Sequence, residues 1–163
     1  GFTLSAVQPH HIEKIRVWRN NQIDVLRQIK HIQKKEQIIY FKNNIWNEMN
    51  LEKPKNILLA FFKEEKFIGY GGLVPIFWEK MHAESSFLLD NSIQADSFNY
   101  RLCLENFFLI LKKLAFDDLK FIKITSETYR HRVEHISMLE KIGFEVVEPL
   151  NNPKSIFHEL KPI

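Results

Sequence analysis

Several side chains that can hold or move a proton gather in the last third of this 163-residue chain. Glu127, Tyr129 and His135 follow an apolar stretch that is typical of a buried strand. Because side chains alternate along a strand, Glu127 and Tyr129 are expected to point to the same side. An imidazole with an ordinary pKa of about 6.5 is a candidate acid or base near neutral pH, and His135 is therefore singled out. The alternative is a capped polar turn that only faces solvent.

Another carboxylate, Glu84, interrupts the apolar stretch from Ala83 to Leu89. Such a carboxylate is a candidate general base, which would accept a proton directly or through a water molecule. The alternative is an exposed strand carboxylate, or one that pairs with Arg or Lys. The single cysteine, Cys103, gives no metal-ligand spacing and fits a small core residue better than a nucleophile. We therefore expect proton-transfer chemistry, with no metal.

Hydrophobic periodicity predicts the elements that position these groups. Strands are expected over residues 2–7, 56–62, 67–77, 83–89, 121–126, 145–147 and 155–160. Helices are expected over residues 9–18, 34–46, 98–116 and 132–142, with a break at 19–21, a cap at Asp96 or Ser97 and a stop at Gly143. Glycines 69, 71 and 72 predict a bulge or a close backbone approach in their strand. The sum is one α+β (mixed α/β) domain over residues 1–163, with helices on both faces of the sheet.

Composition excludes several classes of protein. Hydrophobic residues make up 45% of the chain, which argues against disorder, and one domain of this length can bury a real core. No apolar run approaches the roughly 18 residues of a membrane span, and the start lacks a signal-peptide pattern. A net charge of +3 is too small to predict nucleic-acid binding. The expectation is a cytoplasmic monomer or homodimer that acts on a small molecule, with no membrane partner.

The element order, the Glu-Lys-Ile-Gly-Phe sequence at 140–144 and the glycine-containing strand at 67–73 resemble the GNAT superfamily of N-acetyltransferases. The segments 25–28, 83–89 and 127–129 are similar to the branch that acetylates ribosomal proteins and nucleotide-linked amino sugars. The resemblance implies a mostly antiparallel central sheet, splayed in the middle, and acetyl-CoA as co-substrate. It also implies acetyl transfer to a primary amine, with an amino sugar for surface polysaccharide as the first choice of acceptor. Alternatives are a protein or peptide amine, or a degenerate module that only binds coenzyme A or a partner.

The same resemblance assigns roles to residues. The catalytic candidates are Glu84, Glu127, Tyr129 and His135. The cofactor-binding candidates are Phe87, Leu88, Leu89, Ser92, Gln94, Ser97, Asn99 and Arg132, with a backbone N–H near Phe87 or Leu88 as the oxyanion donor. The acceptor-binding candidates are Trp18, Arg19, Asn20, Arg27, Trp78 and His82.

The chain also departs from the family pattern. Residues 91–100, where the pyrophosphate loop usually contains glycines, have none. Arg132 and His135 replace the usual Asn and Ser before the last helix, and Leu139 replaces the tyrosine that often serves as general acid. The free thiol of coenzyme A has an ordinary pKa of about 8.5, so a dedicated acid is dispensable.

Overall fold

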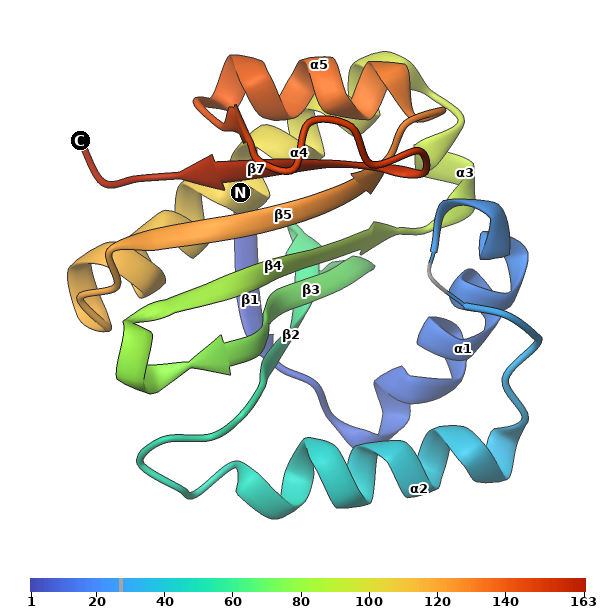
Figure 1. The fold of residues 1–163 in the computed structure, drawn as a ribbon. Coiled ribbons are helices and arrows are strands. Elements are labelled where there is room, and N and C mark those ends of the chain that lie inside the picture. The colour runs from blue at the N-terminus through green and yellow to red at the C-terminus, as the bar shows by residue number, and fades with distance from the viewer. Residues whose placement is uncertain (27) are drawn as a thin grey trace.

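The computed structural model describes residues 1–26 and 28–163, and its centre is one sheet with strand order β1-β2-β3-β4-β5-β7-β6 (Figure 1). The strands are β1 (Phe2–Ala6), β2 (Ile57–Lys63), β3 (Lys66–Phe77), β4 (His82–Leu89), β5 (Lys123–Tyr129), β6 (Glu145–Val147) and β7 (Ser155–Leu160). All neighbouring strands pair antiparallel except β4 and β5, which are parallel. The predicted mostly antiparallel sheet is therefore confirmed.

Helices cover both faces of this sheet, as predicted. They are α1 (Ile12–Asn21), α2 (Lys34–Asn44), α3 (Asn91–Gln94), α4 (Ser97–Lys112) and α5 (Val133–Ile142). In Figure 1, α4 and α5 lie on one side of the strands, and α1 and α2 lie on the other. Among the described residues, no helix combines the length and the apolar character needed to cross a membrane.

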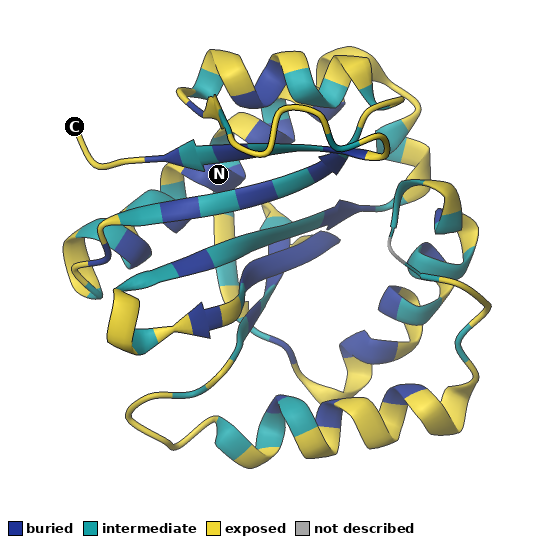
Figure 2. Ribbon diagram, viewed as in Figure 1, coloured by how far each residue is buried: buried dark blue, intermediate teal, exposed yellow. Residues whose placement is uncertain are grey.

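Two hydrophobic clusters fill the two sides. The larger cluster joins α4 and α5 to the sheet, and Phe107, Leu111 and Leu139 within it are fully buried. The smaller cluster joins α1 and α2 to β2, β3 and β4, and it contains the predicted stripe of Ile12, Ile15 and Trp18. Buried residues therefore line the inner sides of the helices, and exposed residues their outer sides, in Figure 2. Cys103 is buried in the core, as expected.

Several predicted boundaries were wrong. Helix α1 continues through Asn20 to Asn21, because Arg19 and Asn20 are held by tertiary hydrogen bonds that outweigh weak helix propensity. A short helix, α3, occupies part of the expected loop before α4, and the Asp90 carboxylate accepts the Ser92 N–H at its start. Strand β5 runs to Tyr129 because its pairing with β7 continues that far.

The parallel pair of β4 and β5 is unusually short. The two strands pair only where residues 82–84 lie opposite residues 123–125, with Glu84 opposite Thr125 as the last pair. Beyond this point β4 continues to Leu89 and β5 continues to Tyr129, but the two strands no longer pair with each other. The strands therefore form a fork whose base lies at Glu84, as the predicted splay requires.

Strand β3 approaches β4 closely at Gly71, which lies opposite Phe87. A Cβ atom on Gly71 would collide with the Ser86 carbonyl oxygen and lie 2.8 Å from Cζ of Phe107. The same strand has a register irregularity between Leu73 and Ile76. The close backbone approach, one of the two alternatives predicted from the clustered glycines, is therefore present at Gly71.

We expect Gly71→Ala to lower the free energy of unfolding by about 1–3 kcal/mol, because the added methyl group overpacks a backbone contact. Urea denaturation followed by circular dichroism measures this change. Ser5→Ala, on an exposed position of β1, is the control and should leave the midpoint nearly unchanged. A wild-type midpoint for the Gly71 variant would contradict the close approach.

Candidate active site

A cleft of about 240 Å³ lies in the fork, and we call it the central cleft. Its walls are residues 84–88 of β4 and residues 126–129 of β5. On the side of α1 it is closed by Arg19, Val25, Leu26 and Val74, and on the side of α4 and α5 by Phe108, Arg132, His135 and Leu139. The cleft therefore passes between the two strands and contacts helices on both faces of the sheet.

All four predicted catalytic residues line the central cleft. Glu84 lies at the base of the fork, while Glu127 and Tyr129 lie on the outer half of β5. Oε2 of Glu127 accepts a hydrogen bond from Oγ of Ser155 at 2.9 Å, which fixes one side of that carboxylate. His135 enters from the first turn of α5. The sequence therefore placed together residues that are 51 positions apart, although their roles remain predictions.

Hydrogen bonds between side chains at the starts of α4 and α5 hold His135 in position. Nη2 of Arg132 donates to the Tyr100 oxygen at 3.1 Å, and that oxygen lies 2.7 Å from Nδ1 of His135. The Tyr100 oxygen therefore accepts from Arg132 and shares a second hydrogen bond with Nδ1 of His135, which holds the imidazole in place. Burial, the Arg132 cation and then His158 hold the pKa of His135 well below its usual value. The expectation that His135 titrates near neutral pH was therefore wrong.

A groove on the exposed face of β5 and β7 adjoins the central cleft, and we call it the open-face groove. Its volume is about 190 Å³, and Glu84, Ser126 and Glu127 line both spaces. Glu148 and Glu159 add further carboxylates to its rim. Glu159 is paired with Lys123 at 2.7 Å. The open-face groove thus has four carboxylate side chains in its lining.

A pocket of about 290 Å³ at the start of α4, which we call the α4 pocket, contains three predicted cofactor-binding residues: Gln94, Ser97 and Arg132. Oε1 of Gln94 is buried without a partner among the described residues. Phe87 and Leu88 line the central cleft, whereas Leu89 is buried in the core.

The two remaining cofactor candidates, Ser92 and Asn99, make hydrogen bonds that cap the N-termini of α3 and α4. Oγ of Ser92 donates to the Asp90 carboxylate at 2.9 Å. The Asn99 N–H donates to the Asp96 carboxylate at 3.2 Å, and this contact confirms Asp96 as the cap of α4. Neither Ser92 nor Asn99 lines the central cleft or the α4 pocket.

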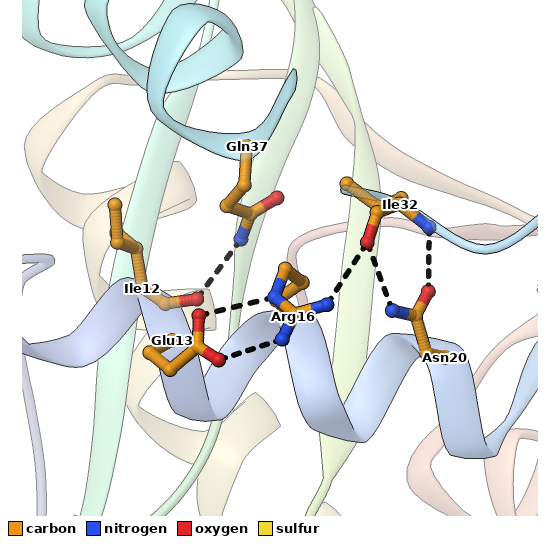
Figure 3. Close-up of polar contacts among 6 residues, drawn as sticks. All are labelled: Ile12, Glu13, Arg16, Asn20, Ile32 and Gln37. Carbon is orange, nitrogen blue, oxygen red and sulfur yellow. Dashed lines mark hydrogen bonds and ion pairs between the residues drawn. The ribbon is translucent and has the colours of Figure 1, made fainter. Parts of the chain in front are cut away.

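Figure 3 shows how the connection between α1 and α2 is anchored. The Asn20 side-chain amide donates to the Ile32 carbonyl at 3.0 Å and accepts the Ile32 N–H at 2.8 Å. Arg16, paired with Glu13, donates to the same carbonyl at 3.1 Å, and Gln37 ties α2 to the Ile12 carbonyl at 3.1 Å. Asn20 was predicted to bind the acceptor, but it does not line the central cleft. It instead fixes the backbone of Ile32, which lines a pocket between α1 and α2.

The other acceptor candidates are dispersed. Arg19 lines the central cleft, but Trp18 is buried against Phe67. The Trp78 indole donates to the Pro54 carbonyl at 2.7 Å, and His82 lies at the closed end of the β4–β5 pair. Arg27 lies outside the described residues. Of the acceptor candidates that the structure describes, only Arg19 reaches the central cleft.

Sequence reasoning missed Tyr100 and Tyr70. Tyr100 is buried in the apolar helix α4, and Tyr70 is buried in β3 beside Arg19. A usable signal existed, because a buried tyrosine hydroxyl normally finds a polar partner.

No group of three or more His, Cys, Asp or Glu side chains in the described part of the chain could hold a metal ion.

The sequence matches the acetyltransferase (GNAT) domain family over residues 4–159. No curated protein sequence matches the chain.

Solved structures share its fold. Spermidine N-acetyltransferase from Vibrio cholerae, solved with CoA and spermine, superposes with a TM-score of 0.77 at 16% identity, over 97% of this chain and 92% of that one. The N-acetyltransferase PseH from Campylobacter jejuni, solved with acetyl coenzyme A, gives 0.72 at 15% identity, over 100% of each chain. A domain from Methanocaldococcus jannaschii gives 0.76 at 11% identity, over 99% of each. At these identities the likeness concerns the fold.

The lowered pKa of His135 predicts how stability depends on pH. The unfolded chain takes up a proton on this residue near pH 6.5, whereas the folded chain does so only at lower pH. Stability from neutral His135 is therefore complete above about pH 6.5 and is lost as the pH falls below it. We expect His135→Gln to flatten the fall of the melting temperature between pH 7 and 5.

Calorimetry over that pH range tests this prediction. His131→Gln is the control, because it removes an exposed histidine from the same turn. Equal pH dependence in the wild type and His135→Gln would show that His135 is not held neutral by the fold.

Proposed function

We propose a function from the premise that this chain belongs to the acetyltransferase (GNAT) family, whose domain matches residues 4–159. The chain is an N-acetyltransferase. In our proposal it transfers an acetyl group from acetyl-CoA to a primary amine by direct attack, with both substrates bound together. The observation that carries this proposal is the fork between β4 and β5, which leaves an unpaired strand edge inside a cleft lined by carboxylates.

The fork has the right form for the pantetheine arm of acetyl-CoA. Backbone groups of β4 beyond Glu84 have no strand partner on the β5 side. An extended amide chain can pair with such an edge as an added strand would. Phosphates of the same ligand would lie toward the α4 pocket, where Arg132, Ser97 and the positive end of α4 supply donors. The residues present therefore fit coenzyme A even without glycines in this loop.

The proposed chemistry uses Glu84 as general base. The amine nitrogen attacks the thioester carbonyl carbon, a C–N bond forms, the C–S bond breaks and the thiolate leaves. Glu84, directly or through water, takes the proton that the nitrogen releases, and the departing thiolate takes a proton from solvent. A backbone N–H of β4 near Phe87 or Leu88 would stabilise the oxyanion. Glu127 and Tyr129 on the opposite wall would orient the amine.

Our first choice of acceptor is an amino sugar linked to a nucleotide. A pocket beside the central cleft supports this choice, because it combines apolar, aromatic and hydroxyl-bearing walls that suit a ring with polar substituents. A polyamine is the second candidate. It is favoured by the carboxylates of the open-face groove and by the similar fold of a spermidine N-acetyltransferase.

We expect Glu84→Gln to lower kcat by about 100-fold or more, because an amide cannot accept the proton from the amine. Acetyl-CoA should still bind with wild-type affinity, since the change leaves the β4 backbone in place. Thiol release in an amine-dependent assay measures the first quantity, and calorimetric titration measures the second. The control is Glu79→Gln, which makes the same carboxylate-to-amide change at an exposed residue just before β4 begins. Retention of full kcat would remove Glu84 from the role of base.

A panel of amines tests the acceptor class. Thiol release from acetyl-CoA is measured with a nucleotide-linked amino sugar, with spermidine and with a peptide bearing a free N-terminus. We expect kcat/KM to be at least 10-fold higher for the amino sugar. A preference for spermidine or the peptide would replace the first choice. Absence of both thiol release and acetyl-CoA binding would contradict the enzymatic proposal.

A further inference from the structure

A second pocket lies between α1, α2 and β3, and we call it the α1–α2 pocket. Its volume is about 300 Å³, and it meets the central cleft at Arg19, Val74 and Ser86. Ile15 and Phe41 are apolar members of its wall, as are Leu58 and Ile32. A ligand that reacts in the fork could therefore extend into this pocket while its reactive end stays in the cleft.

Arg19 lies where the two spaces meet, and it has no acidic partner in the part of the chain that the structure describes. Its Nη1 donates to the Tyr70 hydroxyl oxygen at 2.8 Å, and its Nε donates to Oε1 of Gln28 at 3.1 Å. Both partners are neutral, and no carboxylate among the described residues pairs with this guanidinium. By contrast, Arg16 is paired with Glu13 at 2.7 Å. A partly buried guanidinium with only neutral partners is suited to an anion that arrives with a ligand.

The neighbours of Arg19 hold it in place and leave donors available. Gln28 is itself fixed, because its amide donates to Oδ1 of Asn20 at 3.0 Å and to the Lys30 carbonyl at 2.8 Å. The Tyr70 oxygen accepts from Arg19, so the Tyr70 O–H can donate to a further group. Nη2 of Arg19 has no hydrogen-bond partner among the described residues. A preorganised pair of donors of this kind binds an anion at little conformational cost.

One carboxylate, that of Glu36, also lines the α1–α2 pocket. Its Oε1 accepts the Gln33 N–H at 3.3 Å at the start of α2. Glu36 is thus engaged with the backbone of its own helix, and it suits hydroxyl groups of a ligand. The pocket therefore has distinct places for an anion, for hydroxyls and for an apolar or ring-shaped part.

We propose that the α1–α2 pocket is an acceptor subsite in which Arg19 and Tyr70 bind an acidic group of the amine substrate, a phosphate or a carboxylate. This inference rests on the proposed acetyltransferase function and names the class of its acceptor. The enzyme would select amines that carry an acidic group several bonds from the reacting nitrogen. A polycation such as spermidine would place like charge beside Arg19 and bind poorly.

Calorimetric titration of the CoA-saturated protein tests the proposal, because CoA occupies the other candidate phosphate site. The probes are UDP, glucose 6-phosphate, L-glutamate and spermidine, which separate nucleotide, sugar-phosphate and carboxylate sources of the anion. We expect at least one anionic probe to bind more tightly than spermidine. Its affinity should fall at least 10-fold in Arg19→Gln and less in Arg19→Lys, which keeps the charge but loses the planar fork.

Arg101→Gln is the matched control. Arg101 is paired with Glu105 at 2.9 Å on the outer side of α4, so this variant makes the same charge change away from the pockets. It should bind the anionic probe as the wild type does. Tyr70→Phe, which keeps the ring, tests the second donor and should weaken binding even if Arg19→Gln proves unstable in thermal unfolding.

Binding of no anionic probe, or unchanged affinity in the Arg19 and Tyr70 variants, would overturn the proposal. Tighter binding of spermidine than of every anion would overturn it as well. Failure of CoA itself to bind would count against the acetyltransferase function. That result is measured before the anions are added, so the two failures can be told apart.

Discussion

The site depends on one interruption, because the hydrogen-bond ladder between β4 and β5 ends at Glu84 while both strands continue. Buried backbone N–H and C=O groups need partners, so parted strands persist only where other contacts hold them. β4 is held by its pairing with β3 and by Phe87, whose ring packs 4.7 Å from that of Phe107. β5 is held by β7 as far as Tyr129. The fork is therefore built into the packing, and its open edge is available to an extended ligand.

Much of this arrangement is readable from the sequence. Periodicity predicted the order of the elements, because each strand and helix has one apolar side that must be buried. Glu84, Glu127 and Tyr129, which the sequence analysis singled out, all line the cleft between β4 and β5. Gly143, predicted to end a helix, lies directly after α5 in a positive-φ conformation that glycine adopts readily. Local pattern sufficed wherever the deciding contacts are close in sequence.

The remaining features depend on contacts between distant segments. The pKa of His135 is lowered first by burial and then by the Arg132 and His158 side chains, and His158 lies 23 positions away on β7. Asn20 was predicted to bind a ligand, yet its side-chain amide makes two hydrogen bonds with the Ile32 backbone. Trp18 looked similar but fills the core under α1. Polar and aromatic side chains have several possible partners, and only the packing decides which of them face a cleft.

The charges around the cleft are divided in a way that suits the proposed reaction. Carboxylates lie at the fork, where an incoming ammonium group must approach and lose a proton. The guanidinium groups of Arg132 and Arg19 lie on opposite sides of the sheet, where acidic parts of two ligands can be held away from the reacting atoms. Binding energy gained at those remote groups can be used to orient the thioester and the nitrogen. In the proposed reaction, this division would let one narrow cleft bind two negatively charged ligands without placing their charges side by side.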